Sequence, residues 1–160
     1  MQLSFHPLGA LCADDLLPLW GDAAVVRTTG IGTQLTLEEC AERLTALRAA
    51  DDGAVFAVFQ NGVFCGLAGC LPASQEPPTY GLFYQLVPSA WGKGIGTAAA
   101  RQALSHVQRH PPGARILADV LAENPASERI LLRLGFSLLS QSTELHLGRP
   151  AAVRHYALML

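Results

Sequence analysis

The sequence predicts an α+β fold in which about seven strands form one mixed, mostly antiparallel sheet. An Asn-Gly step at 61–62 separates two apolar runs, which indicates a β-hairpin, and a strand-like run at 80–87 extends it into a meander. A helical run from 94 to about 110 then lies between the strand-like runs at 80–87 and 115–121. This strand–helix–strand order favours a parallel pair with a right-handed crossover.

The N-terminal third is expected to hold one strand and two helices. Alternating apolar and polar residues predict a strand at 2–8, and acidic residues at 14–15 open a short helix. The segment 27–35 is rich in Gly and Thr and is expected to be a loop, either a plain connector or a cover over a binding site. A capping-box pattern at 36–39 then starts a helix that runs to about residue 50.

The second half of the chain adds turns, a helix and two strands. Residues 74–78 are expected to form a longer turn within the meander, and Pro111-Pro112-Gly113 is expected to end the long helix. Asn124-Pro125 supplies a favourable N-cap followed by a residue suited to the first helical position. Two strand-like segments close the chain at 138–147 and 153–160.

Length and composition indicate a single globular domain over residues 1–160. Half of the residues are hydrophobic and 15% are charged, which excludes a disordered chain. The net charge of −2 gives no support for a nucleic-acid partner. No apolar run approaches the ~20 residues that cross a bilayer, and the N-terminus lacks the pattern of a signal peptide. No membrane partner is therefore predicted.

The four cysteines, Cys12, Cys40, Cys65 and Cys70, include no C-x-x-C pair. Their spacing favours neither a zinc site nor a disulfide framework, so no metal ligand is predicted. They are expected to be free, mostly buried thiols, and the location expected from them is cytoplasmic.

The strongest functional pattern is a glycine loop after the third strand of the meander. Residues 92–96, Gly-Lys-Gly-Ile-Gly, lead directly into an alanine-rich helix. The first N–H groups of a helix have no partner within it, and the helix dipole favours an anion there. Glycines allow a ligand to approach the backbone, and Lys93 is the only lysine of the chain. A phosphate or pyrophosphate is the expected ligand, although an ordinary strand-to-helix turn also fits the pattern.

Several motifs, in their order, resemble the GNAT superfamily of acyl-CoA-dependent N-acyltransferases. Residues 91–96 resemble its pyrophosphate loop, and Asn124-Pro125-Ala126-Ser127 followed by Arg-Leu-Gly-Phe at 133–136 is similar to a later family segment. The Trp-Gly-Lys-Gly form and the features at 14–15 and 36–39 resemble the branch of the ribosomal-protein N-terminal acetyltransferases RimJ and RimL. The resemblance covers nearly the whole chain. It implies a three-layer α/β arrangement, with helices on both faces of the sheet and a central, splayed pair of parallel strands.

The resemblance also implies acetyl-CoA as co-substrate, bound where the strand ending near Val87 splays from the strand ending near Leu121. Main-chain groups would pair with pantetheine and polarise the thioester carbonyl, and loop amides would hold the pyrophosphate. The residues implied for cofactor binding are Leu86, Val87, Gly92, Lys93, Gly94, Ile95, Gly96, Thr97, Asn124 and Ser127.

An amine would attack the thioester directly, which leaves an acid and a base to be supplied. Many members of the family use a Tyr as the acid, but the matching position here is Leu131. Ser127, one turn earlier, is the candidate donor to the leaving thiolate, or else only a helix cap. The resemblance favours Glu144 as the base, with a pKa that partial burial in a cleft would raise; the alternative is a solvated strand residue. The rival bases are His146, His155 and Glu123.

Two functions from different classes remain open. The first is an N-acetyltransferase that acts on a primary amine, either a protein N-terminus or a small molecule. The second is a non-catalytic acyl-CoA-binding or regulatory module with the same fold. A homodimer in contact through the apolar final strands is expected from the resemblance.

Overall fold

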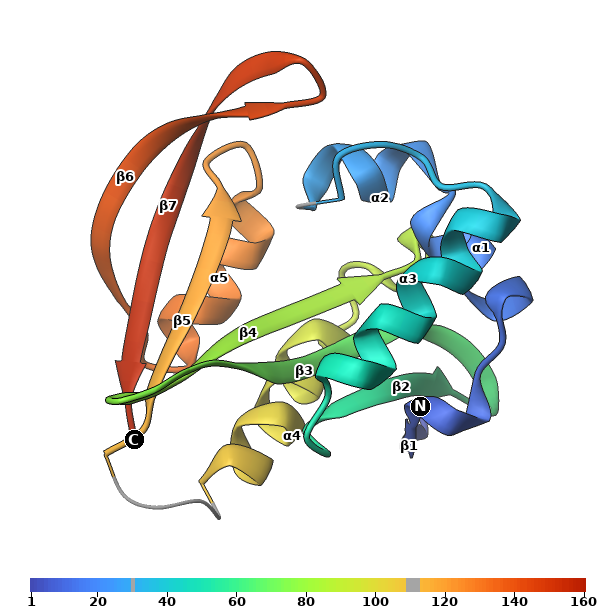
Figure 1. The fold of residues 1–160 in the computed structure, drawn as a ribbon, viewed down its shortest axis with the longest axis horizontal. Coiled ribbons are helices and arrows are strands. Elements are labelled where there is room, and N and C mark those ends of the chain that lie inside the picture. The colour runs from blue at the N-terminus through green and yellow to red at the C-terminus, as the bar shows by residue number, and fades with distance from the viewer. Residues whose placement is uncertain (30, 109–112) are drawn as a thin grey trace.

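The computed structural model describes residues 1–29, 31–108 and 113–160, and its seven strands form one sheet (Figure 1). The strands are β1 Leu3–Pro7, β2 Val55–Gln60, β3 Val63–Gln75, β4 Pro78–Leu86, β5 Arg115–Leu121, β6 Ser137–His146 and β7 Arg149–Met159. The helices are α1 Ala13–Trp20, α2 Ala23–Thr28, α3 Leu37–Ala50, α4 Ile95–Val107 and α5 Pro125–Arg133, with short 3₁₀ turns η1 Leu8–Ala10 and η2 Pro88–Ala90. The strand order is β1-β2-β3-β4-β5-β7-β6.

Only β4 and β5 are parallel neighbours, and every other pair is antiparallel, which confirms the predicted fold class. Their ladder is short: it joins Thr79, Tyr80 and Gly81 to the first three residues of β5. Beyond it the two strands run apart (Figure 1). The C-terminal part of β4 therefore has an open edge that faces β5.

Helices cover both faces of the sheet. On one face Leu16 of α1 and Leu44 of α3 belong to a buried cluster with Val55 and Leu67 of the sheet. On the other face, small residues of α4 pack closely on the sheet, because Ala99 and Ala103 leave room for the strands. The face predicted for this helix, Ile95, Ala99, Ala103 and Val107, is fully buried. Leu131 of α5 joins the same side of the core as Tyr156 of β7.

Two local predictions are confirmed by the structure. Asn61 and Gly62 both have positive φ, as a tight hairpin turn between β2 and β3 requires. Thr36 and Glu39 form the expected capping box: the Thr36 hydroxyl accepts from the Glu39 amide, and the Glu39 carboxylate accepts from the Thr36 amide.

Two expectations differ from the structure, and a third lies outside the described residues. The loop predicted from residue 27 begins with the last turn of α2, which starts after Asp22 because this carboxylate caps its first amides. The longer turn predicted at 74–78 is wrong, since β3 continues to Gln75 and β4 already begins at Pro78. The proposed end of the long helix at Pro111-Pro112 lies outside the described residues.

Candidate active site

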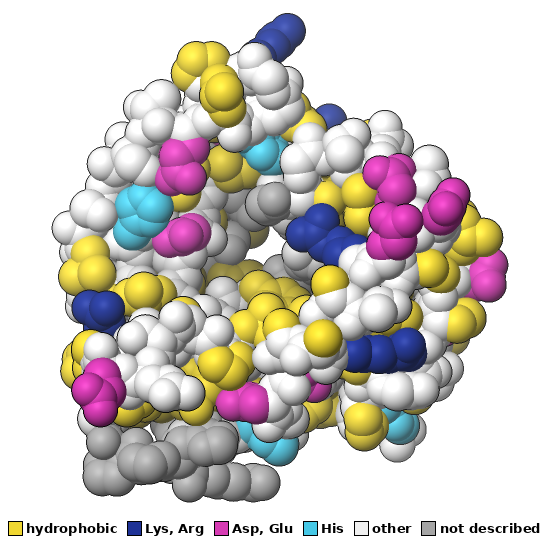
Figure 2. All heavy atoms as spheres, viewed as in Figure 1, with side chains coloured by type: hydrophobic (Ala, Val, Ile, Leu, Met, Phe, Trp, Pro, Cys, Tyr) yellow, Lys and Arg dark blue, Asp and Glu magenta, His cyan; other side chains and the backbone are white. Residues whose placement is uncertain are grey.

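A cleft of about 650 Å³ opens where β4 and β5 separate. Figure 2 shows the surface hollowed near the middle of this view. The walls come from β4, the glycine loop, the start of α4, the end of β5, α5, the end of α2 and the far end of β6. One cavity thus collects segments from nearly the whole length of the chain.

The glycine loop opens into this cleft. Gly92 and Gly94 have φ of +72° and +79°, a left-handed conformation that disfavours other residues, and a Cβ at either would meet nothing within 4 Å. The first residues of α4 line the cleft, and Gly94 at the N-cap supplies no side chain to satisfy their amides. Gly96 differs, because its Cβ would come within 2.9 Å of Ile130 where α4 meets α5. The loop therefore presents free space and backbone donors suited to an anion.

The open edge of β4 carries the second set of backbone groups. Trp91 donates from its indole nitrogen to the Leu86 carbonyl at 2.9 Å, which fastens the glycine loop to the strand. Val87 does not have the free amide expected of a cofactor-binding residue. This amide donates to the Cys65 carbonyl at 2.9 Å, and Val87 does not line the cleft. Since backbone groups alternate in direction along an antiparallel pair, those of Tyr84 and Leu86 face the open edge.

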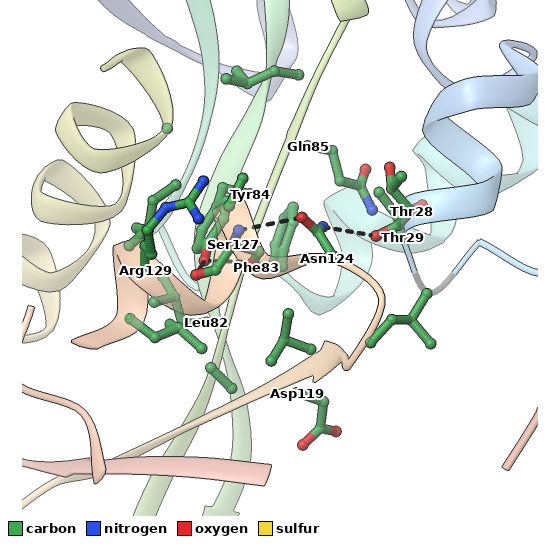
Figure 3. A pocket seen from close by; sticks show the side chains of 18 of the residues that line it. Thr28, Thr29, Leu82, Phe83, Tyr84, Gln85, Asp119, Asn124, Ser127 and Arg129 are labelled. Carbon is green, nitrogen blue, oxygen red and sulfur yellow. Dashed lines mark hydrogen bonds between the residues drawn. The ribbon is translucent and has the colours of Figure 1, made fainter. Parts of the chain in front are cut away.

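Asn124 joins the two sides of the cleft (Figure 3). Its side-chain oxygen accepts from the Ser127 amide at 3.2 Å and so caps α5, as predicted. Its amide nitrogen donates to the Thr28 carbonyl at 3.1 Å, at the end of α2. Asn124 therefore caps α5 as predicted and also links α5 to α2, a helix that the sequence did not predict.

Tyr84 is a site residue that the sequence analysis missed. Its hydroxyl lies 2.8 Å from the Ser127 hydroxyl and 3.1 Å from the Ser127 carbonyl, and both residues line the cleft (Figure 3). Burial raises the pKa of Tyr84 to about 12, so the phenol stays protonated and available as a donor. The contact spans 43 residues, and nothing in the strand pattern marks this tyrosine. Leu131, at the position matching the usual acid, is buried in the core.

The candidate bases are placed differently from one another. Glu144 lines the cleft but its side chain is 54% exposed, so it is less enclosed than expected, and it accepts from Ser142 at 2.7 Å. His146 also lines the cleft and contacts the Arg27 carbonyl at 3.0 Å. His155 and Glu123 are not among the lining residues.

Positive charge near the cleft comes mainly from α5. Arg129 and Arg133 line it, whereas Lys93 does not. Arg133 belongs to a motif seen in the sequence, but Arg129 carried no signal of its own. In the described part of the chain, no group of three or more His, Cys, Asp or Glu side chains could hold a metal ion. None of the described helices combines the length and apolar character needed to span a membrane.

Comparison with known proteins identifies the class. The family model described as "Acetyltransferase (GNAT) domain" matches residues 2–137. The chain therefore belongs to the GNAT acetyltransferase family. Among curated proteins, no sequence match was found.

Solved structures share the fold at low sequence identity. The ribosomal L7/L12 acetyltransferase RimL in complex with coenzyme A gives a TM-score of 0.84 at 17% identity, over 100% of this chain and 95% of that one. A ribosomal-protein-alanine N-acetyltransferase from Brucella melitensis gives 0.79 at 19%, over 100% of both chains. A phosphinothricin acetyltransferase from Sinorhizobium meliloti with acetyl-CoA gives 0.76 at 18%, over 99% of this chain and 88% of that one.

Proposed function

We propose that the protein is an acetyl-CoA-dependent N-acetyltransferase that acts on a primary amine by direct attack. The observation that carries this proposal is the uncapped N-terminus of α4, which opens into the cleft beside the free edge of β4. The loop amides of 92–97 bind the pyrophosphate, and Arg129 and Arg133 add positive charge for the phosphates. The Leu86 amide donates to the thioester carbonyl, where charge develops during attack.

Bound acetyl-CoA supplies an activated acetyl group. A carbon–nitrogen bond forms, the carbon–sulfur bond breaks, and an ammonium substrate releases one net proton as the sulfur takes another. Ser127 donates a hydrogen bond to the departing sulfur, and Tyr84 supports it when the phenol is the donor in the 2.8 Å contact with the Ser127 hydroxyl. Glu144 is the base that removes the proton from the amine.

The acceptor class that we favour is the N-terminal amine of a peptide or protein. Two of the fold neighbours named above are ribosomal-protein N-acetyltransferases. Glu144 and His146 line the cleft at the far end of β6, where the Glu144 side chain is exposed to an incoming amine. A small-molecule amine is the alternative acceptor.

Release of the free CoA thiol in the presence of an amine panel tests this function. The panel contains short peptides with free N-termini, the same peptides with blocked N-termini, and small primary amines. We expect release with free N-termini and none with blocked ones. Binding of acetyl-CoA by calorimetry without release for any amine would instead identify a non-catalytic acyl-CoA-binding module.

A further inference from the structure

A chain of four polar side chains crosses the last three strands of the sheet. His155 of β7 contacts Asp119 of β5 through Nδ1 at 2.7 Å, and its Nε2 lies 2.7 Å from the Ser142 hydroxyl on β6. The same hydroxyl donates to Glu144 at 2.7 Å. Figure 2 shows a histidine flanked by acidic side chains on the part of the surface where β6 and β7 lie.

Strand register brings these residues together. Asp119 pairs directly with His155, and Ser142 pairs with Val153, two residues before His155. Paired residues and residues two apart share a face of the sheet, so Asp119, His155, Ser142 and Glu144 all project from one side. The chain runs from Glu144 to Asp119, both of which line the cleft, and the Asp119 side chain is 66% exposed.

The donor at each ring nitrogen of His155 depends on its tautomer. All three contacts are hydrogen bonds only when the four groups hold one proton more than two carboxylates, a hydroxyl and a neutral imidazole supply. In one form His155 is an imidazolium that donates to both Asp119 and Ser142, and Ser142 donates to Glu144. In the other form Glu144 is protonated and donates to Ser142, which donates to neutral His155. The two forms contain the same protons and interconvert when two of them shift along the chain.

We propose that Glu144, Ser142, His155 and Asp119 form a proton-transfer chain that carries the proton of the substrate amine away from Glu144 to the exposed carboxylate of Asp119, and from there to water. Glu144 accepts the proton from nitrogen, and Ser142 passes its own proton to Nε2 as it receives that of Glu144. The imidazolium then releases its Nδ1 proton through Asp119 to water. His155 is left protonated on Nε2, and exchange with water returns that proton to Nδ1 before the next turnover. The middle step moves two protons and the others one each, and every bond between heavy atoms stays intact. This proposal rests on the proposed acetyl transfer, because it concerns the fate of that proton.

Asp119 ends the chain with an exposed carboxylate that also lines the cleft. In Figure 3 this carboxylate points away from Tyr84, Ser127 and Asn124. The charged and titratable groups that face His155 are Asp119 and Glu144, with His146 two residues beyond Glu144 on the same face of β6. Arg154 and Glu128 pair on the opposite face of the sheet, at the α5 side.

A second interpretation treats Ser142, His155 and Asp119 as a nucleophilic triad. The spacing of the three groups fits, but Ser142 does not line the cleft and its hydroxyl is shared with a second carboxylate. An attacking serine needs access to the acyl carbon and donors for the oxyanion. The relay requires neither, so the geometry favours it.

Buffer rescue tests the relay. With an amine found in the panel, His155→Gln should lower kcat roughly tenfold at low buffer concentration, less than the loss of a general base. Added imidazole should restore most of this loss, because a small base can carry the proton in place of the side chain. His6→Gln, on β1 at the other end of the sheet, is the matched control and should behave as the unaltered protein. Unchanged kcat, or a loss that imidazole does not restore, would overturn the relay.

A titration of His155 by NMR gives a readout that needs no substrate. Ser142→Ala and Glu144→Gln should both shift the midpoint of the His155 resonance, assigned by its absence in His155→Gln. Thr143→Ala removes a hydroxyl from the same strand, on the opposite face, and should not. A His155 midpoint insensitive to Ser142 and Glu144 would overturn the chain even if acetyl transfer occurs. Coupled titration without transfer to any amine would instead contradict the proposed function. Hydrolysis of acetyl-CoA without amine, lost in Ser142→Ala, would support the triad and overturn the relay.

Discussion

The two sides of the cleft are built on different principles. The side formed by the glycine loop and β4 presents backbone groups, from residues 92–97 and the edge at Leu86. The side formed by β5, β7 and β6 presents side chains, and its chain from Asp119 to Glu144 depends on contacts across three strands. Backbone groups stay in place when nearby side chains are substituted. A hydrogen-bonded series of side chains is interrupted when one of its members is replaced. The first side should therefore be sensitive to backbone conformation and the second to single functional groups.

Gly94→Val should have the largest effect, and it should disrupt only the side of the cleft formed by the glycine loop and β4. The valine must adopt a positive φ, and its side chain would enter the open space at Gly94, where we propose that the pyrophosphate binds. Acetyl-CoA binding measured by calorimetry should be abolished while the fold, followed by circular dichroism, is kept. Gly53→Val is the matched control, because Gly53 also has positive φ with open space around it and lies in a turn before β2. Both variants carry a strain on the order of 1–2 kcal/mol. Retained affinity in folded Gly94→Val would contradict the assigned phosphate site.

Glu144→Gln should disrupt the side of the cleft formed by β5, β7 and β6. Turnover should fall on the order of 10²–10⁴-fold, because a general base is lost, while acetyl-CoA affinity changes little. Steady-state kinetics measures the loss of turnover and calorimetry measures acetyl-CoA affinity. Glu42→Gln, at an exposed position of α3, is the control. Unaltered rates from about pH 6 to 9 would show that the base is elsewhere. His146 would then be the next residue to replace, because it also lines the cleft.

Tyr84→Phe and Ser127→Ala should have smaller effects on the departure of the thiolate. Each should lower kcat about tenfold or less, since thiolate is already a good leaving group and water can replace a lost hydroxyl. The loss should shrink when the acetyl donor carries a more acidic thiol than CoA. Tyr80→Phe, on the same strand, controls for loss of a hydroxyl. Equal losses with every thiol would mean that the pair acts on structure rather than on the leaving group.

The pH dependence of stability tests whether Tyr84 stays neutral in the folded protein, as a hydrogen-bond donor must. Burial raises the pKa of Tyr84 to about 12, and burial is also the main cause of the raised pKa values of Tyr80 and Tyr156. A folded pKa above the unfolded value of about 10 stabilises the fold fully below pH 10. That contribution is lost as pH rises toward 12. Phenolate absorbance should therefore rise later in the folded protein than in denaturant, and ionisation of all tyrosines near pH 10 would contradict it.

The smallest effect on chemistry should come from disrupting self-association. β6 is an edge strand with exposed Leu138, Leu139 and Leu145, which fits the expected dimer contact on the side-chain side of the cleft. Light scattering should give a dimer mass at micromolar concentration, and Leu138→Lys with Leu139→Lys, neither of which lines the cleft, should give a monomer that still binds acetyl-CoA. A monomeric unaltered protein would contradict the expected homodimer.

Local patterns identified the features that short segments form by themselves. The hairpin at 61–62, the capping box at 36–39 and the N-cap at Asn124 follow from the conformational preferences of a few neighbouring residues. The GNAT family and the glycine loop were found for the same reason. The short helix α2 was missed because six residues give too few turns for a periodic pattern.

The sequence by itself predicted the seven-stranded fold class and the family, and it located the glycine loop, because each depends on short motifs and on their order along the chain. Only the tertiary structure decided that Tyr84 meets Ser127 and that Val87 turns its amide toward Cys65. It alone joined Asp119 and Glu144 through β7, since the register between distant strands selects which side chains share a face. One residue of slip would send each of these side chains to the opposite face, and no local pattern in the sequence encodes that choice.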